Sequence, residues 1–140
     1  FQVVIDEHPG TVAASKAAYF AGNINYEAGQ YREALEYYRA GAAPGKKNYS
    51  VLLCMQGEAT CYEQLEEYEK AVEVYLTILE KFSESFSVPA IHYSLGRLYE
   101  ELDKAEEAEA AYELVVSKYS WSSWSELAEK KLLYLKSTSS

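Results

Sequence analysis

A spacing of 37 residues constrains this chain more than any other feature of its sequence. Tyr38, Tyr75 and Tyr112 are separated by this distance. Other positions of matching size repeat with the same spacing: Ala34, Ala71 and Ala108; Gly22, Ala59 and Gly96; and Ile24, Cys61, Leu98 and Leu135. A fixed period between about 20 and 50 residues is typical of stacked repeat proteins. The sequence therefore predicts a series of similar units rather than one irregular fold.

Within each period the apolar residues follow helical spacing, and alternating strand patterns are nearly absent. We predict helices over about residues 12–28, 31–42, 48–65, 68–82, 91–102, 105–118 and 122–136. Residues 1–7 have the pattern of a helix end, which Pro9-Gly10 would stop. Thr11, and either Asn48 or Ser50, are candidate N-caps. We expect Ile24 and Leu127 to face the core.

The small residues of the period predict close helix crossings. Gly22, Ala59 and Gly96 would lie where the first and second helices of each pair approach, because no larger side chain fits there. The repeated tyrosines would then wedge into the gap toward the next pair.

Three segments carry degenerate forms of one helix-pair motif. They are His92-x2-Leu95-Gly96-x2-Tyr99 with Ala108-x3-Tyr112, Met55-x2-Glu58-Ala59-x2-Tyr62 with Ala71-x3-Tyr75, and Ala18-x2-Ala21-Gly22 with Ala34-x3-Tyr38. These motifs resemble the tetratricopeptide repeat signature. The resemblance implies an all-α superhelix, a TPR-like solenoid of about three helix pairs with a partial helix before and a capping helix after.

The resemblance also implies a division of the chain. We expect one domain over 1–140, with the end of a preceding repeat at 1–9, repeats at 11–44, 48–84 and 87–119, and a capping helix at 121–137. The chain would be a fragment of a longer protein. The family's period is 34 residues, so the extra residues lie in the linkers. These linkers resemble those of bacterial cell-envelope tetratricopeptide proteins, although only His8-Pro9-Gly10-Thr11 keeps the proline. This implies a periplasmic or envelope location and a role in envelope assembly; a cytoplasmic location is the alternative.

Charge excludes two classes of partner. The net charge is −9, and 15 of the 22 acidic residues lie between Glu58 and Glu113. Nucleic acid and anionic lipid both require clustered basic residues, so neither is expected. No segment is apolar enough to insert into a membrane. Cys54 and Cys61 are seven residues apart on one helix face, too far for a disulfide within that helix, and are expected to be buried thiols.

The sequence offers no catalytic or metal-binding arrangement. His8 and His92 lie in different units, and the usual cysteine and histidine spacings of zinc sites are absent. His92 occupies the place of a packed aromatic residue in the motif. No nucleophile has a base and an orienting group beside it. We therefore expect no enzyme activity, no cofactor and no metal site.

Binding of a protein or peptide is the predicted function. In the family the leading helices line a concave groove that holds an extended segment or a helix of a partner. By register, the groove residues here would be Tyr19, Asn23, Tyr26, Gln56, Thr60, Glu63, Tyr93, Arg97, Lys130 and Tyr134, with Lys131 beside them. Asn23 and Arg97 suit a clamp for a C-terminal carboxylate, but the lysines that such a clamp needs are missing.

Two other functions stay open. The chain could self-associate, with Trp121 and Trp124 either closing the core or forming an exposed partner patch. It could also be a regulatory module of a larger protein. The first prediction remains a non-enzymatic scaffold that holds a partner in the groove.

Overall fold

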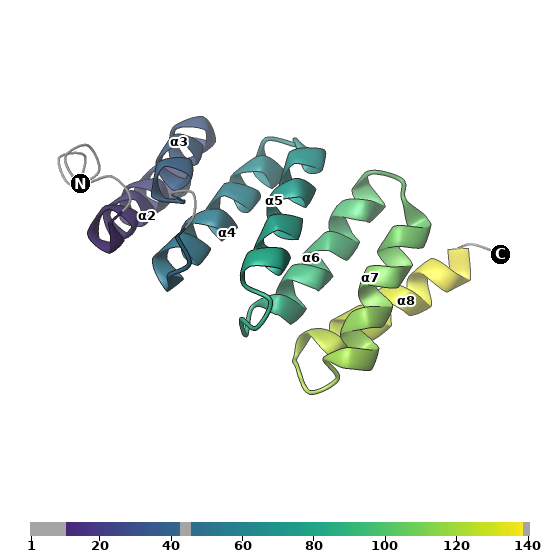
Figure 1. Ribbon diagram of the computed structural model, residues 1–140. Helices are drawn as coiled ribbons and strands as arrows, with labels where there is room; N and C mark the ends of the chain where they lie inside the picture. Colours follow the sequence, from purple (N-terminus) through teal and green to yellow (C-terminus); the bar gives the residue numbers. More distant parts are fainter. Residues whose placement is uncertain (1–10, 43–45, 139–140) are drawn as a thin grey trace. The chain divides into compact units, whose positions relative to one another are not determined.

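The computed structural model describes residues 11–42 and 46–138, which form helices joined by turns and loops (Figure 1). Two compact units divide after Phe82. The first holds α2 (Val12–Glu27), α3 (Tyr31–Gly41), α4 (Tyr49–Gln64) and α5 (Tyr68–Lys81). The second holds α6 (Val88–Glu101), α7 (Ala105–Lys118) and α8 (Trp124–Thr138). The described residues contain no strand, so the predicted all-α class is confirmed.

Predicted and observed helix bounds differ by a few residues. The largest differences are at α6, which begins before Ile91, and at the end of α8, which continues to Thr138 instead of fraying after Lys136. The predicted helix end at 1–7 lies outside the described residues, as do Pro9-Gly10 and residues 43–45. The division after Phe82 falls just before the predicted end of the second repeat, at residue 84. The assignment of 1–140 to one domain stays a prediction.

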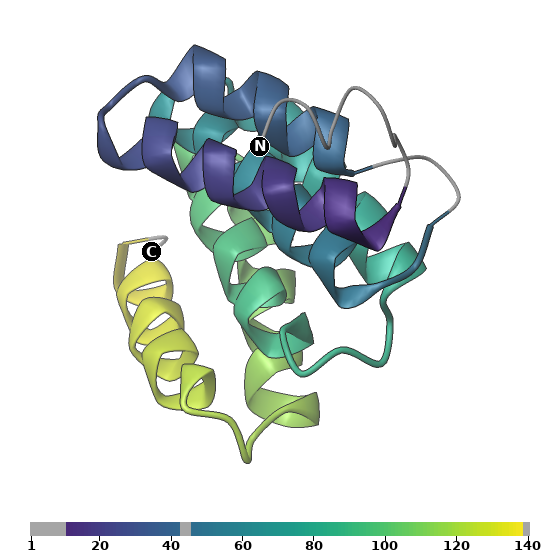
Figure 2. The ribbon, with the colours of Figure 1, turned by 90° about the vertical axis from the view of Figure 1, so that its left-hand side faces the viewer.

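The first unit stacks two antiparallel helix pairs. In Figure 2, α2 (purple) turns back into α3 (blue), and α4 pairs with α5 in the same way. Both α2 and α3 also pack on α4. Thr11 and Asn48 cap α2 and α4 by accepting hydrogen bonds of 3.0 Å from the backbone N–H groups of Ala14 and Val51. The fully buried residues between the helices include Ala18, Ala34, Val51, Ala59, Ala71 and Ile78.

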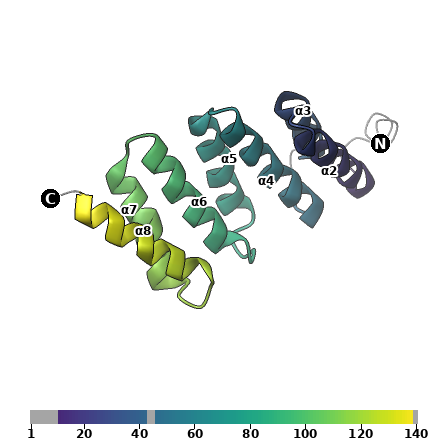
Figure 3. The same ribbon diagram turned by 180° about the vertical axis from the view of Figure 1, so that it is seen from behind.

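The second unit is one helix pair with a third helix on it. α6 and α7 are antiparallel, and α8 lies along α7 and contacts α6 (Figure 3). Its core contains Ala108, Tyr112, Val115, Ala128 and Leu132. Pro89 lies in the first turn of α6, where a missing N–H costs no helical hydrogen bond.

All three turns within the helix pairs have the same backbone conformation. Gly29, Glu66 and Asp103 are 37 residues apart, and their φ angles are 78°, 59° and 57°. The following residue of each turn donates its N–H five residues back, as Glu67 does to the Tyr62 carbonyl at 2.8 Å. This is the Schellman ending, whose left-handed residue favours glycine. The repeat therefore extends to backbone conformation, although only one of the three positions is glycine.

Two of the small residues predicted at helix crossings, Gly22 and Gly96, lie directly against the repeated tyrosines. A Cβ atom added at Gly22 would lie 2.5 Å from the Tyr38 ring, and one added at Gly57 would lie 2.6 Å from it. A Cβ atom at Gly96 would likewise overlap the Tyr112 ring. Tyr38 thus wedges between α2 of its own pair and α4 of the next pair, as expected. The role of Gly57 was not anticipated.

Two residues expected in the core are exposed. Ile24 is 61% exposed and Leu127 is 42% exposed. Cys61, at the position of Ile24 in the next repeat, is fully buried because α4 packs on the preceding helices. α2 has no preceding helix among the described residues. Leu127 lies on α8, the last of the described helices.

Candidate partner-binding pocket

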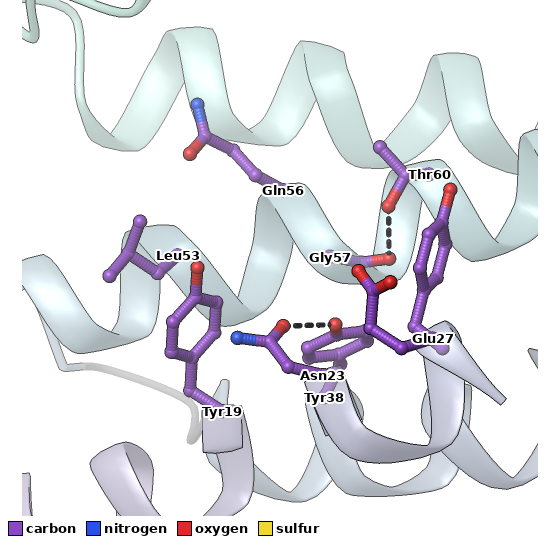
Figure 4. Close-up of a pocket in the computed structure, with 9 residues that line it drawn as sticks. Tyr19, Asn23, Glu27, Tyr38, Leu53, Gln56, Gly57 and Thr60 are labelled. Atoms are coloured by element: carbon purple, nitrogen blue, oxygen red, sulfur yellow. Dashed lines mark hydrogen bonds between the residues drawn. The ribbon is translucent and has the colours of Figure 1, made fainter. Parts of the chain in front are cut away.

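A pocket of about 410 Å³ lies in the first unit, over α2, α3 and α4. Its lining combines aromatic rings, amides and one carboxylate: Tyr19, Asn23, Tyr26, Glu27, Tyr38, Leu53, Gln56, Gly57 and Thr60. Figure 4 shows Tyr19, Asn23 and Glu27 on one helix, facing Leu53, Gln56 and Thr60 on another. A volume of this size lies in the range of small-ligand pockets, about 300–1,000 Å³.

Tyr38 and Asn23 form the base of the pocket. The Tyr38 hydroxyl donates to Asn23 Oδ1 at 2.5 Å (Figure 4). Burial raises the pKa of Tyr38 well above its usual value, so the hydroxyl keeps the proton that it donates. Since Oδ1 is occupied, the Asn23 amide nitrogen is the group that remains to donate to a partner.

The two other tyrosine rings are held in place by their neighbours. The centroid of the Tyr19 ring is 6.2 Å from that of Tyr38. The Tyr26 ring meets Tyr31 edge-on at 5.2 Å, and its hydroxyl accepts a hydrogen bond of 3.2 Å from Gln64 Nε2. A ring that is already ordered loses little conformational entropy when a partner binds.

The structure brings together five of the ten predicted groove residues. Tyr19, Asn23, Tyr26, Gln56 and Thr60 all line this pocket. Glu63 does not, because its carboxylate accepts a hydrogen bond of 2.9 Å from the Tyr75 hydroxyl. The function of all ten as partner-binding residues stays a prediction.

The other four predicted residues belong to the second unit. The ring of Tyr93 packs between Tyr112, at 5.5 Å, and Trp124, at 5.2 Å, so it contributes to the core. Arg97 contacts the Ser94 hydroxyl at 3.4 Å. Lys130 pairs loosely with Glu126, whereas Lys131 lies 3.3 Å from Glu100, and Tyr134 is 63% exposed. No pocket described in this unit contains any of these predicted residues.

The two tryptophans have different environments. Trp124 is half-buried and packs against the core of the second unit, whereas Trp121 is 71% exposed. One of them therefore contributes to the core and the other lies at the surface.

Four pocket residues were missed by sequence reasoning. Glu27 follows Asn23 by four residues and Leu53 precedes Gln56 by three, so helical spacing places each beside a predicted residue. That spacing could have identified both. Tyr38 and Gly57 could not be found in this way, because their place in the pocket depends on how one helix pair packs on the next.

The remaining reactive side chains are held in structural environments. Cys54 and Cys61 are buried and unbridged, and burial raises the pKa of each thiol to about 12. His92 stacks on Tyr119 at 6.0 Å, and burial beside Lys118 lowers its pKa. Across residues 11–42 and 46–138, no cluster of three or more acidic, cysteine or histidine side chains could hold a metal ion. In the same part of the chain, no helix has the length and hydrophobicity to cross a membrane.

Comparison with known proteins identifies the family. A tetratricopeptide repeat family model matches residues 4–47 and 57–120. The chain therefore belongs to the tetratricopeptide repeat family, as the motifs indicated. Its structure is similar to that of PcrH, solved in complex with the chaperone binding region of PopD. The match has a TM-score of 0.75 and 17% sequence identity, and covers 95% of this chain and 99% of PcrH. No curated protein sequence matches the chain significantly.

Proposed function

We propose that this chain is a non-enzymatic scaffold that holds a segment of a partner protein in the pocket over α2 and α4. The observation that carries the proposal is the pocket itself, in which five residues expected to contact a partner converge. PcrH, a protein of the same fold, was solved with a binding region of another protein. That precedent favours a protein segment as the occupant.

The polar groups of the pocket suit the backbone of an extended segment. The Asn23 amide nitrogen can donate to a peptide carbonyl. The Gln56 side chain makes no hydrogen bond within the described residues, so its amide can both donate and accept. Tyr19 and Tyr26 add rigid contact area of the kind that dominates protein interfaces. A bound segment would thus find hydrogen bonds and aromatic surface in one place.

A peptide-display selection against the whole chain tests the proposal. Selected peptides should lose at least about tenfold in affinity for the Tyr19→Ala/Gln56→Ala variant, because two central contacts are removed. Tyr49→Ala is the matched control, since Tyr49 is 57% exposed on α4 and lies outside the pocket. Circular dichroism should show equal helix content in all three proteins.

Equal binding by the wild type and the double variant would overturn the pocket as the binding site. Adding Arg97→Ala as a separate variant tests the prediction for the second unit. A loss of affinity there would extend the site to α6, and no loss would restrict it to the first unit.

Self-association is a second candidate function. Phe20 and Ile24 are 53% and 61% exposed on one face of α2, and Trp121 is 71% exposed. Such residues are often buried between subunits. Light scattering across a concentration series measures this directly: a constant monomer mass would exclude it.

We also propose a cellular role and a location for the chain. A role in bacterial envelope assembly and a periplasmic location are supported by the linkers that resemble those of envelope proteins. Fractionation of cells that express the full-length protein would test the location, and recovery in the cytoplasm alone would overturn it. A regulatory role within a larger protein is the remaining alternative.

A further inference from the structure

The charge of the pocket favours one kind of side chain from the partner. None of the nine lining residues is basic, and the only ionised group among them is the carboxylate of Glu27. Glu27 makes no ion pair or hydrogen bond within the described residues. The two arginines of α3 line a different pocket and are paired with other carboxylates, Arg32 with Glu67 at 3.2 Å and Arg39 with Glu58 at 3.9 Å. Glu27 is therefore the one charged residue of the pocket lining, with no basic residue among the other eight.

The aromatic rings add to this preference. Tyr19, Tyr26 and Tyr38 all line the pocket, and the face of a phenol ring is electrostatically negative. A Lys or Arg side chain that approaches such a face is attracted to it, and more strongly when water is excluded. Tyr26 directly precedes Glu27 on α2, and both line the pocket, whereas Tyr19 lies about 12 Å further along the helix axis, on the same pocket wall.

Other occupants fit less well. An acidic side chain would meet Glu27 with no cation to compensate it. A large apolar side chain would cover the amides of Asn23 and Gln56 without giving them hydrogen bonds, which is unfavourable. A basic side chain avoids both problems, because its apolar stem can pack on the rings while its charged end faces the carboxylate.

We propose that this pocket receives a Lys or Arg side chain of the bound partner segment, packed against the aromatic lining at the Tyr26 end with its charge facing Glu27. This inference rests on the proposed function and adds the chemistry of the partner: a segment with a basic anchor residue. The net charge of −9 would favour the approach of such a segment over long range.

The selected peptides provide the first measurement. They should be enriched in Lys or Arg at one position. Replacing that residue by citrulline or norleucine, which keeps a similar shape without the charge, should weaken binding about 3- to 30-fold. Unchanged affinity after this replacement would overturn the inference.

Variants of the chain provide the second measurement. Glu27→Gln should weaken binding of the basic peptide about 3- to 30-fold. Glu33→Gln removes the same charge from the exposed surface of α3, outside the pocket, and should change affinity less than twofold. Tyr26→Phe should keep most of the affinity because the ring face remains, whereas Tyr26→Leu should lose it. Equal effects of Glu27→Gln and Glu33→Gln would indicate only general charge attraction and overturn the inference.

The two proposals fail in different ways. Peptides that need Tyr19 and Gln56 but carry no basic anchor would disprove the basic anchor and leave the pocket as the binding site. Peptides that bind independently of Tyr19 and Gln56 would disprove both. Affinity of the basic peptide that does not change between 50 and 500 mM salt would also count against the inference, because exposed charge pairs are screened.

Discussion

At the scale of single residues, Glu58 stands out as a charge where the repeat has apolar side chains. The equivalent positions hold Ala21, Leu95 and Leu132, all buried. The Glu58 side chain is 15% exposed, and its ion pair with Arg39 is long, at 3.9 Å. Burial raises the pKa of Glu58, and the Arg39 guanidinium only partly offsets this. The ionised carboxylate is therefore unfavourable in the folded state.

We predict that Glu58→Leu stabilises the chain by about 1–2 kcal/mol at pH 7, because it removes a poorly paired buried charge and adds apolar burial. Glu58→Gln is the matched control, since it removes the charge and keeps the shape; it should stabilise by a smaller amount. Thermal unfolding followed by circular dichroism measures both.

The pH dependence has a definite sign. The pKa of Glu58 is higher in the folded chain than in the unfolded chain, so the folded state binds the proton more tightly. The wild type therefore loses stability from this residue as pH rises from about 4.5 through the folded pKa. The advantage of Glu58→Gln should shrink when pH is lowered from 7 to 4.5. An advantage that grows instead would mean that Arg39 makes the ionised form favourable.

At the scale of elements, the left-handed residues of the three turns give a clear prediction. For a residue other than glycine, the left-handed conformation costs about 1–2 kcal/mol. We expect Glu66→Gly to stabilise the chain by about 0.5–1 kcal/mol after the extra unfolded-state entropy of glycine is counted. Glu73→Gly, an exposed position inside α5, should instead destabilise by about 1 kcal/mol. Equal changes at both sites would contradict the backbone explanation.

The elements also show what the sequence can predict. Helix positions, the caps Thr11 and Asn48, and the wedging of Tyr38 toward the next pair follow from local patterns and from the period, and the structure agrees. The exposure of Ile24 does not follow, because burial at that position depends on whether another helix pair precedes it. The pocket was predicted in part. Residue spacing predicts which side chains share a helix face, but it does not predict how one helix pair packs on the next.

The capping-helix assignment of α8 stays a prediction, and three exposed positions of α8 differ from the repeat. Leu133 occupies the position of Gly96 and is 71% exposed, while Glu129 and Lys136 occupy the positions of His92 and Tyr99. The charged replacements suit contact with water.

At the scale of the whole molecule, the division into two compact units predicts how the chain unfolds. Both tryptophans lie in the second unit, so their fluorescence reports that unit, whereas circular dichroism reports helices of both. Gly96→Ala would force a methyl group against the buried Tyr112 ring and should cost about 1–3 kcal/mol. In repeat proteins a local loss of stability first lowers the unfolding temperature of the unit that contains the substitution.

We therefore expect Gly96→Ala to lower the fluorescence midpoint by several degrees and to split the circular dichroism transition. Gly22→Ala makes the same change against Tyr38 in the first unit, where the added Cβ would lie 2.5 Å from the ring. It should lower the temperature at which the circular dichroism transition begins. The tryptophan transition should stay near its wild-type temperature. Because the two substitutions are chemically identical, a difference between the fluorescence and circular dichroism transitions shows which unit has lost stability. If both signals instead move together in both variants, the two units unfold as one cooperative domain over 1–140.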